Sequence, residues 1–166
     1  MRDIRLFSIL LVNFIGSLGF SLVIPFLVIL VTKYGVNAIV YGLVGATYPF
    51  FQLIGSPLLG RWSDIYGRKP VLLVSQAGTL LSWIIFLAAL FLPIQTLFIF
   101  SPLGIIVSLP LLVIIIARVL DGLTGGNVAV TQAYVADIST PENRGKVFGQ
   151  LSISSNLGFV LGPALA

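Results

Sequence analysis

The stretch GRWSDIYGRKP, residues 60–70, holds four charged side chains and joins two long runs of sequence that hold none. The run before it covers residues 34–60, and the run after it covers residues 70–117. A helix that crosses a bilayer needs about 20 consecutive apolar residues, so either run is long enough to cross at least once. The stretch therefore predicts a short charged connection between two membrane-spanning helices.

The composition places the whole chain in the same class. Of its 166 residues, 58% are hydrophobic and only 8% are charged, whereas a soluble domain carries about 25% charged residues. We therefore expect an all-α integral membrane protein. The net charge of +4 then reflects orientation in the membrane and not affinity for nucleic acid. Because cysteine and histidine are both absent, disulfides, thiolate chemistry and histidine metal sites are excluded, and we predict no cofactor and no metal.

Charge-free runs predict five spanning helices, near residues 4–31, 38–60, 71–92, 109–136 and 147–166. The run 70–117 would form a helix of about 72 Å, which is more than twice the thickness of the hydrocarbon core. Pro93, Pro102 and Pro110 interrupt this run, so we divide it into two helices. The apolar segment between these two helices is either a loop on the bilayer surface or an additional span.

The distribution of basic residues decides between these alternatives. Cytoplasmic loops of membrane proteins are enriched in lysine and arginine. With five spans and a cytoplasmic N-terminus, seven basic residues lie inside and only Lys33 lies outside. The seven are Arg2, Arg5, Arg61, Arg68, Lys69, Arg144 and Lys146. An additional span would change the ratio to five against three, so the rule favours five spans.

Two charged residues fall inside the predicted helix 109–136. Arg118 and Asp121 are three residues apart and share one helix face, where each charge costs about 2.5–3.5 kcal/mol at the centre of the bilayer. Gly122 and Gln132 continue the same face. One interpretation is a structural ion pair inside the bundle. The other, which we favour because ionisable groups within membranes commonly serve function, is a polar pathway for substrate or protons.

Polar residues also recur on other faces. The predicted helix 4–31 carries a stripe at every fourth position, namely Asn13, Ser17 and Ser21. This stripe predicts a packed or water-facing side, and we add Asn13 to the candidate pathway. A second stripe in the helix 109–136 consists of Asn127, Thr131 and Tyr134. Such stripes more often form hydrogen bonds between helices than binding sites, so we predict interhelical hydrogen bonding for this one.

The charged connection at 60–70 has features that a simple turn does not explain. Gly60 and Gly67 permit the backbone angles of a tight reversal. Arg68 and Lys69 precede a helix, where the macrodipole disfavours cations, so they serve topology and not helix stability. Neither role explains Asp64, which lies four residues before Arg68. We therefore favour a specific ion pair over a merely solvated loop.

Three motifs resemble those of the major facilitator superfamily of secondary transporters. The charged connection matches the family's pattern Gly-x-Leu-Ala-Asp-Arg-x-Gly-Arg-Lys-x-x-Leu at Gly60, Asp64, Gly67, Arg68, Lys69 and Leu72. A motif in the fourth helix is similar at Arg118 and Gly122, with Asp121 where the family commonly has glutamine. A motif in the fifth helix resembles the antiporter pattern at Gly149, Gly158, Gly162 and Pro163.

The resemblance implies a fold and a latch. It implies five helices of an N-terminal six-helix bundle, so we expect the chain to be the N-terminal part of a longer transporter whose C-terminal half is absent. It also implies that Asp64 pairs with Arg68, and with Asp137 and Arg144, to hold one conformation. Tetracycline-type exporters often carry a carboxylate in the first helix at the position of Gly16, which leaves Asp121 as the carboxylate deep in the membrane.

We therefore predict secondary transport of a small molecule by alternating access, coupled to protons and directed outward. The implied partners are the lipid bilayer, a small-molecule substrate and protons, with no nucleic acid. Two alternatives stay open: an uptake symporter of the same superfamily and a non-transporting membrane assembly protein. We do not expect an enzyme, because serine–histidine and metal–histidine sites need histidine and an aspartyl site needs two apposed carboxylates.

Overall fold

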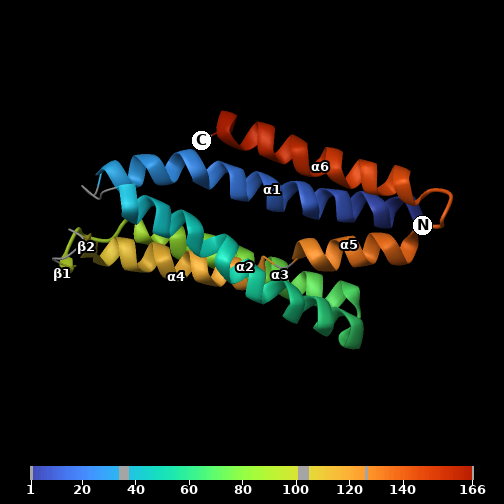
Figure 1. Cartoon of the computed structure of the whole chain (residues 1–166), viewed down its shortest axis with the longest axis horizontal. Helices are drawn as coiled ribbons and strands as arrows, with labels where there is room; N and C mark the ends of the chain where they lie inside the picture. The colour runs from blue at the N-terminus through green and yellow to red at the C-terminus, as the bar shows by residue number, and fades with distance from the viewer. Residues whose placement is uncertain (1, 34–37, 101–104, 126, 166) are drawn as a thin grey trace.

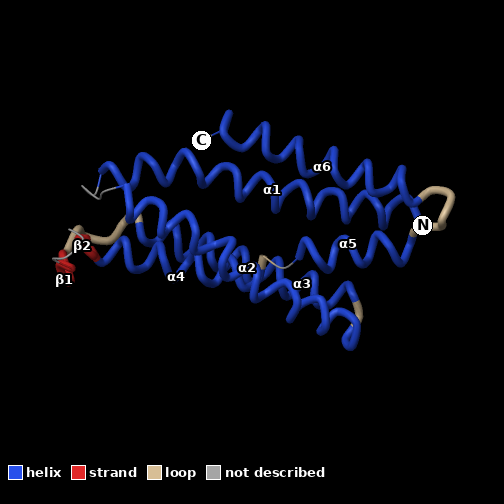
Figure 2. Tube along the Cα trace, in the orientation of Figure 1, coloured by secondary structure: helices blue, strands red, loops and turns tan. Residues whose placement is uncertain are grey.

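The computed structural model describes residues 2–33, 38–100, 105–125 and 127–165. These residues form six α-helices and one β-hairpin (Figure 1, Figure 2). The helices are α1 (Arg2–Lys33), α2 (Ala38–Tyr66), α3 (Arg68–Ala89), α4 (Leu109–Thr124), α5 (Asn127–Ile138) and α6 (Arg144–Leu165). Parts of three predicted segments lie outside the described residues: 101–104 in the apolar connection, 126 in the predicted helix 109–136, and 166 at the end of the last helix.

The outer surface of the bundle is apolar and its interior is partly polar, which is the reverse of a soluble protein. Leu53 and Val160 are 75% and 70% exposed, whereas Ser75 and Ser82 are fully buried and Arg118 is 2% exposed. Four segments among the described helices are long and apolar enough to cross a membrane, namely Leu6–Pro25, Ala38–Tyr66, Arg68–Leu90 and Leu109–Ile138. These features confirm the prediction of an all-α integral membrane protein.

The fifth predicted span corresponds to α6, which differs from the other four. It has 22 residues, yet it is not among the described segments that are apolar enough to span by composition. Serine and asparagine residues between positions 152 and 156 lower its hydropathy. Helix α6 lies along α1 (Figure 1), and Ser154 and Ser155 of α6 form hydrogen bonds with Leu10 and Asn13 of α1, so part of its polar surface faces another helix.

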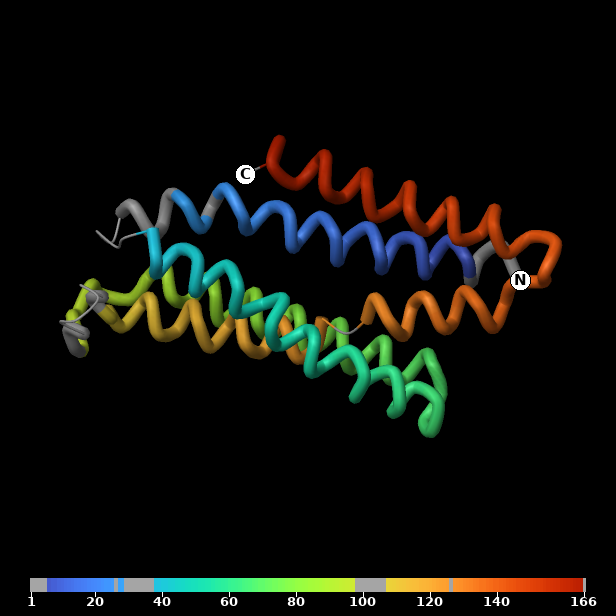
Figure 3. The backbone as a smooth tube through the Cα atoms, viewed as in Figure 1, coloured from blue at the N-terminus to red at the C-terminus, as the bar shows by residue number. Residues whose placement is uncertain are grey.

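The helices pack in two groups (Figure 1, Figure 3). The first group is α1 with α6, the second is α2 with α3 and α4, and α5 contacts both. Buried side chains such as Val44, Phe86 and Ile114 join α2, α3 and α4 in one apolar cluster. The N-terminus, the α2–α3 turn and the α5–α6 turn lie at one end of the bundle, and the hairpin lies at the other (Figure 1).

The apolar connection between α3 and α4 forms the hairpin. Strand β1 (Thr96–Phe100) pairs antiparallel with β2 (Ile105–Ser108). At its base, the N–H of Leu109 donates to the carbonyl of Gln95 at 2.9 Å. Strands of five and four residues are shorter than the roughly 9–11 residues that a spanning strand needs. The described part of this segment is therefore not an additional span.

The charged connection is shorter than predicted. Helix α2 continues through Gly60 to Tyr66 and α3 begins at Arg68, so Gly67 alone lies between them. Gly67 has a φ of 91°, which glycine adopts without the steric cost of other residues. The prediction that Gly60 contributes to the reversal is wrong, because one left-handed residue suffices. Gly60 stays helical, and its carbonyl accepts a hydrogen bond from Ser63 Oγ at 2.6 Å.

The predicted helix 109–136 is divided into α4 and α5. The N–H of Gly125 closes the last turn of α4 on the carbonyl of Asp121 at 2.6 Å. The carbonyl of Thr124 accepts a hydrogen bond from Ser75 Oγ of α3, and that of Gly125 accepts one from Gln52 Nε2 of α2 at 2.9 Å. A break in a membrane helix is tolerated where neighbours satisfy the freed carbonyls. Glycine also weakens a helix by about 1 kcal/mol relative to alanine.

Candidate functional site: an internal cavity and an ion-pair network

A cavity of about 590 Å³ lies inside the bundle and is lined by residues of all six described helices. Its aromatic lining consists of Phe20, Tyr48, Trp83 and Phe159. Asp121 is the only charged residue of the described chain that lines it. Small-molecule sites are mostly apolar cavities of roughly 300–1,000 Å³ with a few placed polar groups, so this cavity is the candidate binding site. The described residues contain no cluster of three side chains suited to a metal ion.

The two predicted intramembrane charges form an ion pair in the wall of the cavity. Arg118 Nη2 lies 3.1 Å from Asp121 Oδ2, and the two side chains are 2% and 6% exposed. Asp121 lines the cavity, whereas Arg118 does not. Removing one partner of a buried pair costs about 3–5 kcal/mol, because the other charge then stays buried alone. Each of the two residues therefore stabilises the charged form of the other.

Aromatic rings also surround Arg118. Its guanidinium carbon lies 5.3 Å from the ring centre of Phe86, 5.8 Å from that of Trp83 and 5.9 Å from that of Tyr48. Cation–π attraction acts within about 6 Å, so all three rings contribute. Its Nε is buried without a hydrogen-bond partner among the described residues, and Nη2 lies near Asp121 without the alignment of a hydrogen bond. The rings and the charge of Asp121 therefore replace hydrogen bonds as the groups that hold Arg118.

The break between α4 and α5 changes which polar residues reach the cavity. Contrary to the prediction, Gln132 is exposed and does not line the cavity, because the predicted face assumed an uninterrupted helix. Asn127 and Thr131 line the cavity instead and are 7% and 1% exposed. The stripe predicted to bond between helices therefore supplies two cavity residues. Asn13 also lines the cavity, and its place in a transport pathway stays a prediction.

Small residues bring α1 and α6 into backbone contact. A Cβ atom at Gly158 would lie 2.7 Å from an amide nitrogen of α1, and one at Gly162 would clash with Ser21 Oγ. Ser21 Oγ donates to the carbonyl of Gly158 at 2.9 Å. Asn13 Nδ2 donates to the carbonyl of Leu151 at 3.0 Å. The helix pair is therefore held by polar bonds that the missing side chains of two glycines make possible.

The other predicted small residues differ in their surroundings. A Cβ atom at Gly122 would lie 2.5 Å from the carbonyl oxygen of Tyr48, so this glycine lets α4 approach α2. Gly149 is exposed, and no atom lies within 4 Å of a Cβ built on it. Pro163 lies within α6 and is exposed. Of the antiporter-like residues, Gly158 and Gly162 alone form the contact with α1 in the described chain.

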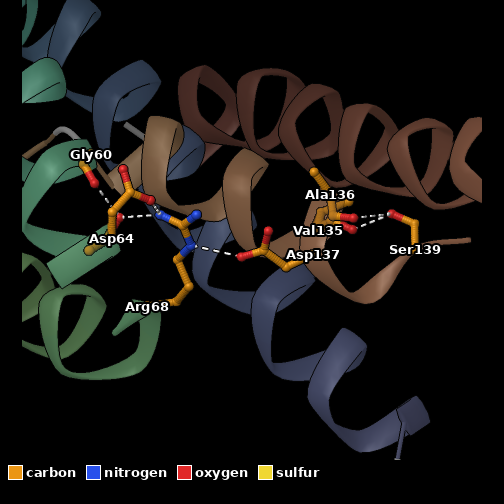
Figure 4. A network of polar contacts seen from close by, with 8 residues as sticks. Gly60, Asp64, Arg68, Val135, Ala136, Asp137 and Ser139 are labelled. Carbon is orange, nitrogen blue, oxygen red and sulfur yellow. Dashed lines mark hydrogen bonds and ion pairs between the residues drawn. The ribbon is translucent and has the colours of Figure 1, made fainter. Parts of the chain in front are cut away.

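Arg68 joins α2, α3 and α5 at the end of the bundle that holds the two turns (Figure 4). Its Nη1 lies 2.5 Å from Asp64 Oδ1, and its Nε lies 2.9 Å from Asp137 Oδ2. Nη1 also donates to Ser63 Oγ at 2.6 Å. The Arg68 side chain is 19% exposed, while those of Asp64 and Asp137 are 64% and 54% exposed. A planar guanidinium can bridge two carboxylates in this way, which a lysine ammonium does less well.

Two further residues of the predicted latch lie outside this network. Lys69 and Arg144 form no ion pair among the described residues. Arg144 is the first residue of α6 and follows a turn. In this turn, the carbonyl of Thr140 accepts hydrogen bonds from the N–H groups of Asn143, at 3.1 Å, and Arg144, at 2.9 Å. In the same turn, hydrogen bonds from its own backbone N–H and from Thr140 lower the pKa of Glu142.

Motifs alone do not identify every residue of this site. Tyr48, Trp83 and Phe86 belong to no motif, because their rings meet Arg118 only once α2, α3 and α4 have packed. Ser63 does carry a signal, since it stands where the resembling pattern has alanine. A hydroxyl there adds a hydrogen-bonding group next to the charged residues of the connection.

Apolar-faced helices around an internal cavity with a few polar groups define a multi-pass membrane protein with an internal site. Residues 9–166 match the profile of the Major Facilitator Superfamily, and the chain belongs to that superfamily. It is 31% identical over 159 residues to "Tetracycline resistance protein, class D" of Salmonella ordonez, covering 94% of this chain and 36% of that protein. It is 34% identical over 161 residues to "Multidrug resistance protein 2" of Bacillus subtilis (strain 168), covering 95% and 35%. The chain thus spans about a third of the length of these relatives.

Proposed function

We propose that the full-length protein exports a small amphipathic molecule in exchange for protons, by alternating access. The observation that carries the proposal is the internal cavity, whose one charged lining residue in the described chain, Asp121, pairs with the buried Arg118. The names of the relatives, which refer to resistance against tetracycline and against multiple drugs, support outward transport. Secondary transporters place substrate and coupling-ion sites near the bilayer midplane between moving parts.

Asp121 carries the coupling proton in this proposal. In α1, this chain has Gly16 at the position where tetracycline-type exporters often carry a carboxylate, so α1 offers no carboxylate there. A proton that binds Asp121 converts the carboxylate to a neutral acid and removes the charge that faces Arg118. The aromatic rings still hold the guanidinium, at 5.3–5.9 Å from its carbon, so protonation alters the pair without releasing Arg118 into the cavity.

The Arg68 network serves as a latch for one conformation. Exposed ion pairs contribute only about 0–1 kcal/mol each, and both carboxylates are more than half exposed. Free energies of this size shift the population of one conformation several-fold, yet they allow the network to open in each transport cycle. We also propose that this end faces the cytoplasm. All seven basic residues outside Lys33 and Arg118 belong to segments at this end, as the positive-inside rule requires.

Two other functions have less support. An uptake symporter would fit the fold, but the relatives' names refer to resistance, which export explains. A non-transporting assembly protein would not need a buried charge pair beside a cavity, because such a pair costs desolvation free energy. We therefore propose a transporter, and not an enzyme or an assembly factor.

Flux measurements in liposomes test the proposal. The full-length protein is reconstituted, a pH gradient is imposed, and tetracycline movement is followed with and without the gradient. Antiport predicts accumulation in the acidic compartment, whereas symport predicts accumulation in the alkaline one. Asp121→Asn is expected to keep substrate exchange at equal pH but to lose the response to the gradient. Glu142→Gln, which removes an exposed carboxylate in the α5–α6 turn, should behave as wild type. Gradient-driven flux that survives in Asp121→Asn would refute the role of this residue.

A further inference from the structure

The first residue of α5 lines the cavity close to Gly16 of α1, a position that has no side chain. Asn127, the first residue of α5, is 7% exposed and lines the cavity. Gly16 of α1 also lines the cavity, and a Cβ atom built on it would lie 3.6 Å from Asn127 Nδ2. The Asn127 amide nitrogen therefore lies close to a position without a side chain. We call the part of the cavity that Gly16 and Asn127 line the α5 notch.

No hydrogen bond joins the Asn127 amide to another described residue, and the residue as a whole is more than nine-tenths buried in the wall of the cavity. Buried polar groups in proteins are nearly always hydrogen-bonded. Asn13 of the same cavity obeys this rule, since it donates to Leu151 and to Ser155. Gln76, another cavity residue, also holds a buried amide nitrogen without an acceptor. The cavity therefore presents donors whose acceptors must come from something that enters it.

The backbone adds donors and a positive potential at the same place. The first N–H groups of a helix have no partner within it, and the N-terminus carries about half a positive charge. Helix α5 has 12 residues, and its first turn is part of the cavity wall through Asn127 and Val128. Helices that are interrupted within a membrane use such N-termini to bind anionic groups of a substrate.

The charged residues near the notch do not oppose the binding of an anion there. Asp121 lines the same cavity as Asn127. Its charge is balanced by Arg118 at 3.1 Å. An anion at the notch is therefore not repelled by a net negative cavity, and a cationic group of the same ligand would lie on the Asp121 side.

We propose that the α5 notch binds an oxyanion of the transported molecule, such as a carboxylate, phenolate or enolate attached to an apolar body. The proposal rests on the proposed function for the statement that the ligand is transported, but binding itself can be tested separately. The substrate class is then an amphipathic molecule with a negatively charged oxygen, and Asn127 is a residue that determines specificity.

Binding of two matched probes tests the notch. The full-length protein in lipid nanodiscs is titrated calorimetrically with 1-naphthoate and with 1-naphthamide, and empty nanodiscs correct for partitioning. Wild type should bind the carboxylate at least about tenfold more tightly, the effect of one hydrogen bond to a charged group. Asn127→Leu should abolish this preference, and Asn127→Asp should reverse it. Retained naphthamide binding shows that a variant is folded.

Matched controls come from α6. Asn156 is exposed and does not line the cavity, so Asn156→Leu and Asn156→Asp should keep the wild-type preference. Gly16→Asp places a carboxylate in the notch, in space that a Cβ atom enters at ordinary contact distance, and should abolish the preference as well. The proposal is overturned if wild type shows no preference, binds neither probe at millimolar concentration, or keeps its preference in Asn127→Asp.

The two proposals fail separately. Gradient-driven tetracycline flux without a preference for naphthoate refutes the notch and leaves the proposed function intact. A preference for naphthoate that depends on Asn127, in a protein without any flux, refutes transport and leaves the binding site intact.

Discussion

Gly158→Ala tests the contact between α1 and α6. In the structure, a Cβ atom at this position would lie 2.7 Å from the amide nitrogen of Leu18, 2.8 Å from the carbonyl oxygen of Phe14 and 2.8 Å from Ser17 Cβ. Two of these three atoms belong to the backbone, which cannot rotate away as a side chain can. The two helices must therefore separate, and the hydrogen bond from Ser21 Oγ to the Gly158 carbonyl, now 2.9 Å long, must lengthen.

The expected magnitude follows from two opposing terms. Replacing glycine by alanine inside a helix stabilises it by about 1 kcal/mol. Forcing an extra methyl group into a packed interface costs about 1–3 kcal/mol, and contact with backbone atoms places this site toward the upper part of that range. We expect Gly158→Ala to lower the free energy of unfolding by about 1–2 kcal/mol.

Gly149→Ala is the matched control, because it makes the same change in the same helix where no atom lies within 4 Å of the new Cβ. It should leave the stability unchanged or raise it by up to about 1 kcal/mol. The assay is unfolding of the full-length protein in mixed micelles by titration with sodium dodecyl sulfate, followed by circular dichroism. If Gly158→Ala is as stable as Gly149→Ala, the close packing of α1 on α6 does not exist in the folded protein.

Three further predictions concern the charged and polar networks. Asp64→Asn should slow transport by the full-length protein several-fold while membrane insertion, measured by protease accessibility, stays normal; unchanged efflux would exclude the latch. Arg118→Lys keeps the charge but loses the planar group that lies against three rings, so we expect at least tenfold slower transport in the liposome assay, and a normal rate would show that this geometry is irrelevant. Gln52→Leu removes the donor to the Gly125 carbonyl and should cost about 1–3 kcal/mol in the same unfolding assay; no change would mean that water satisfies the carbonyl.

The helices that the sequence predicts best are those whose ends coincide with charged residues. Charge-free runs located α1 and the start of α2 and α3 because lipid excludes charges over a whole span, and the prolines from Pro93 onward indicated where α3 ends. The break after α4 was not predictable in the same way, because glycine is common within membrane helices. What permits the break is a pair of donors on other helices, Ser75 and Gln52. The prediction placed Gln132 on the same face as Arg118 and Asp121 because it assumed an uninterrupted helix, so this error follows from the one break.

The hairpin between α3 and α4 shows a second limit of the sequence. Between Pro93 and Pro110, apolar residues follow one another without the spacing of either a helix or a half-buried strand. Short apolar runs of this kind fit both structures. The prolines indicated an interruption, and only the backbone pairing of β1 with β2 shows what replaces the helix.

In the candidate site, the spacing of residues in the sequence indicated contacts between near neighbours but gave no signal for contacts between distant residues. Asp64 and Arg68 lie four residues apart, and this spacing led us to favour an ion pair. Arg118 and Asp121 lie three residues apart, and an ion pair was one of two interpretations of that spacing. Asp137 came from the resemblance to a family, since it lies 69 residues from Arg68. The rings around Arg118 depend on the packing of three helices and had no signal in the sequence.

The two ends of the bundle are closed by different kinds of bond. At the hairpin end, α3 and α4 are joined by a backbone hydrogen bond between Leu109 and Gln95 and by the paired strands. At the other end, ion pairs from Arg68 reach two carboxylates that are more than half exposed to solvent. Dissolved salt weakens ion pairs between exposed side chains, but it has little effect on backbone hydrogen bonds. Raising the ionic strength therefore loosens the bundle at one end only.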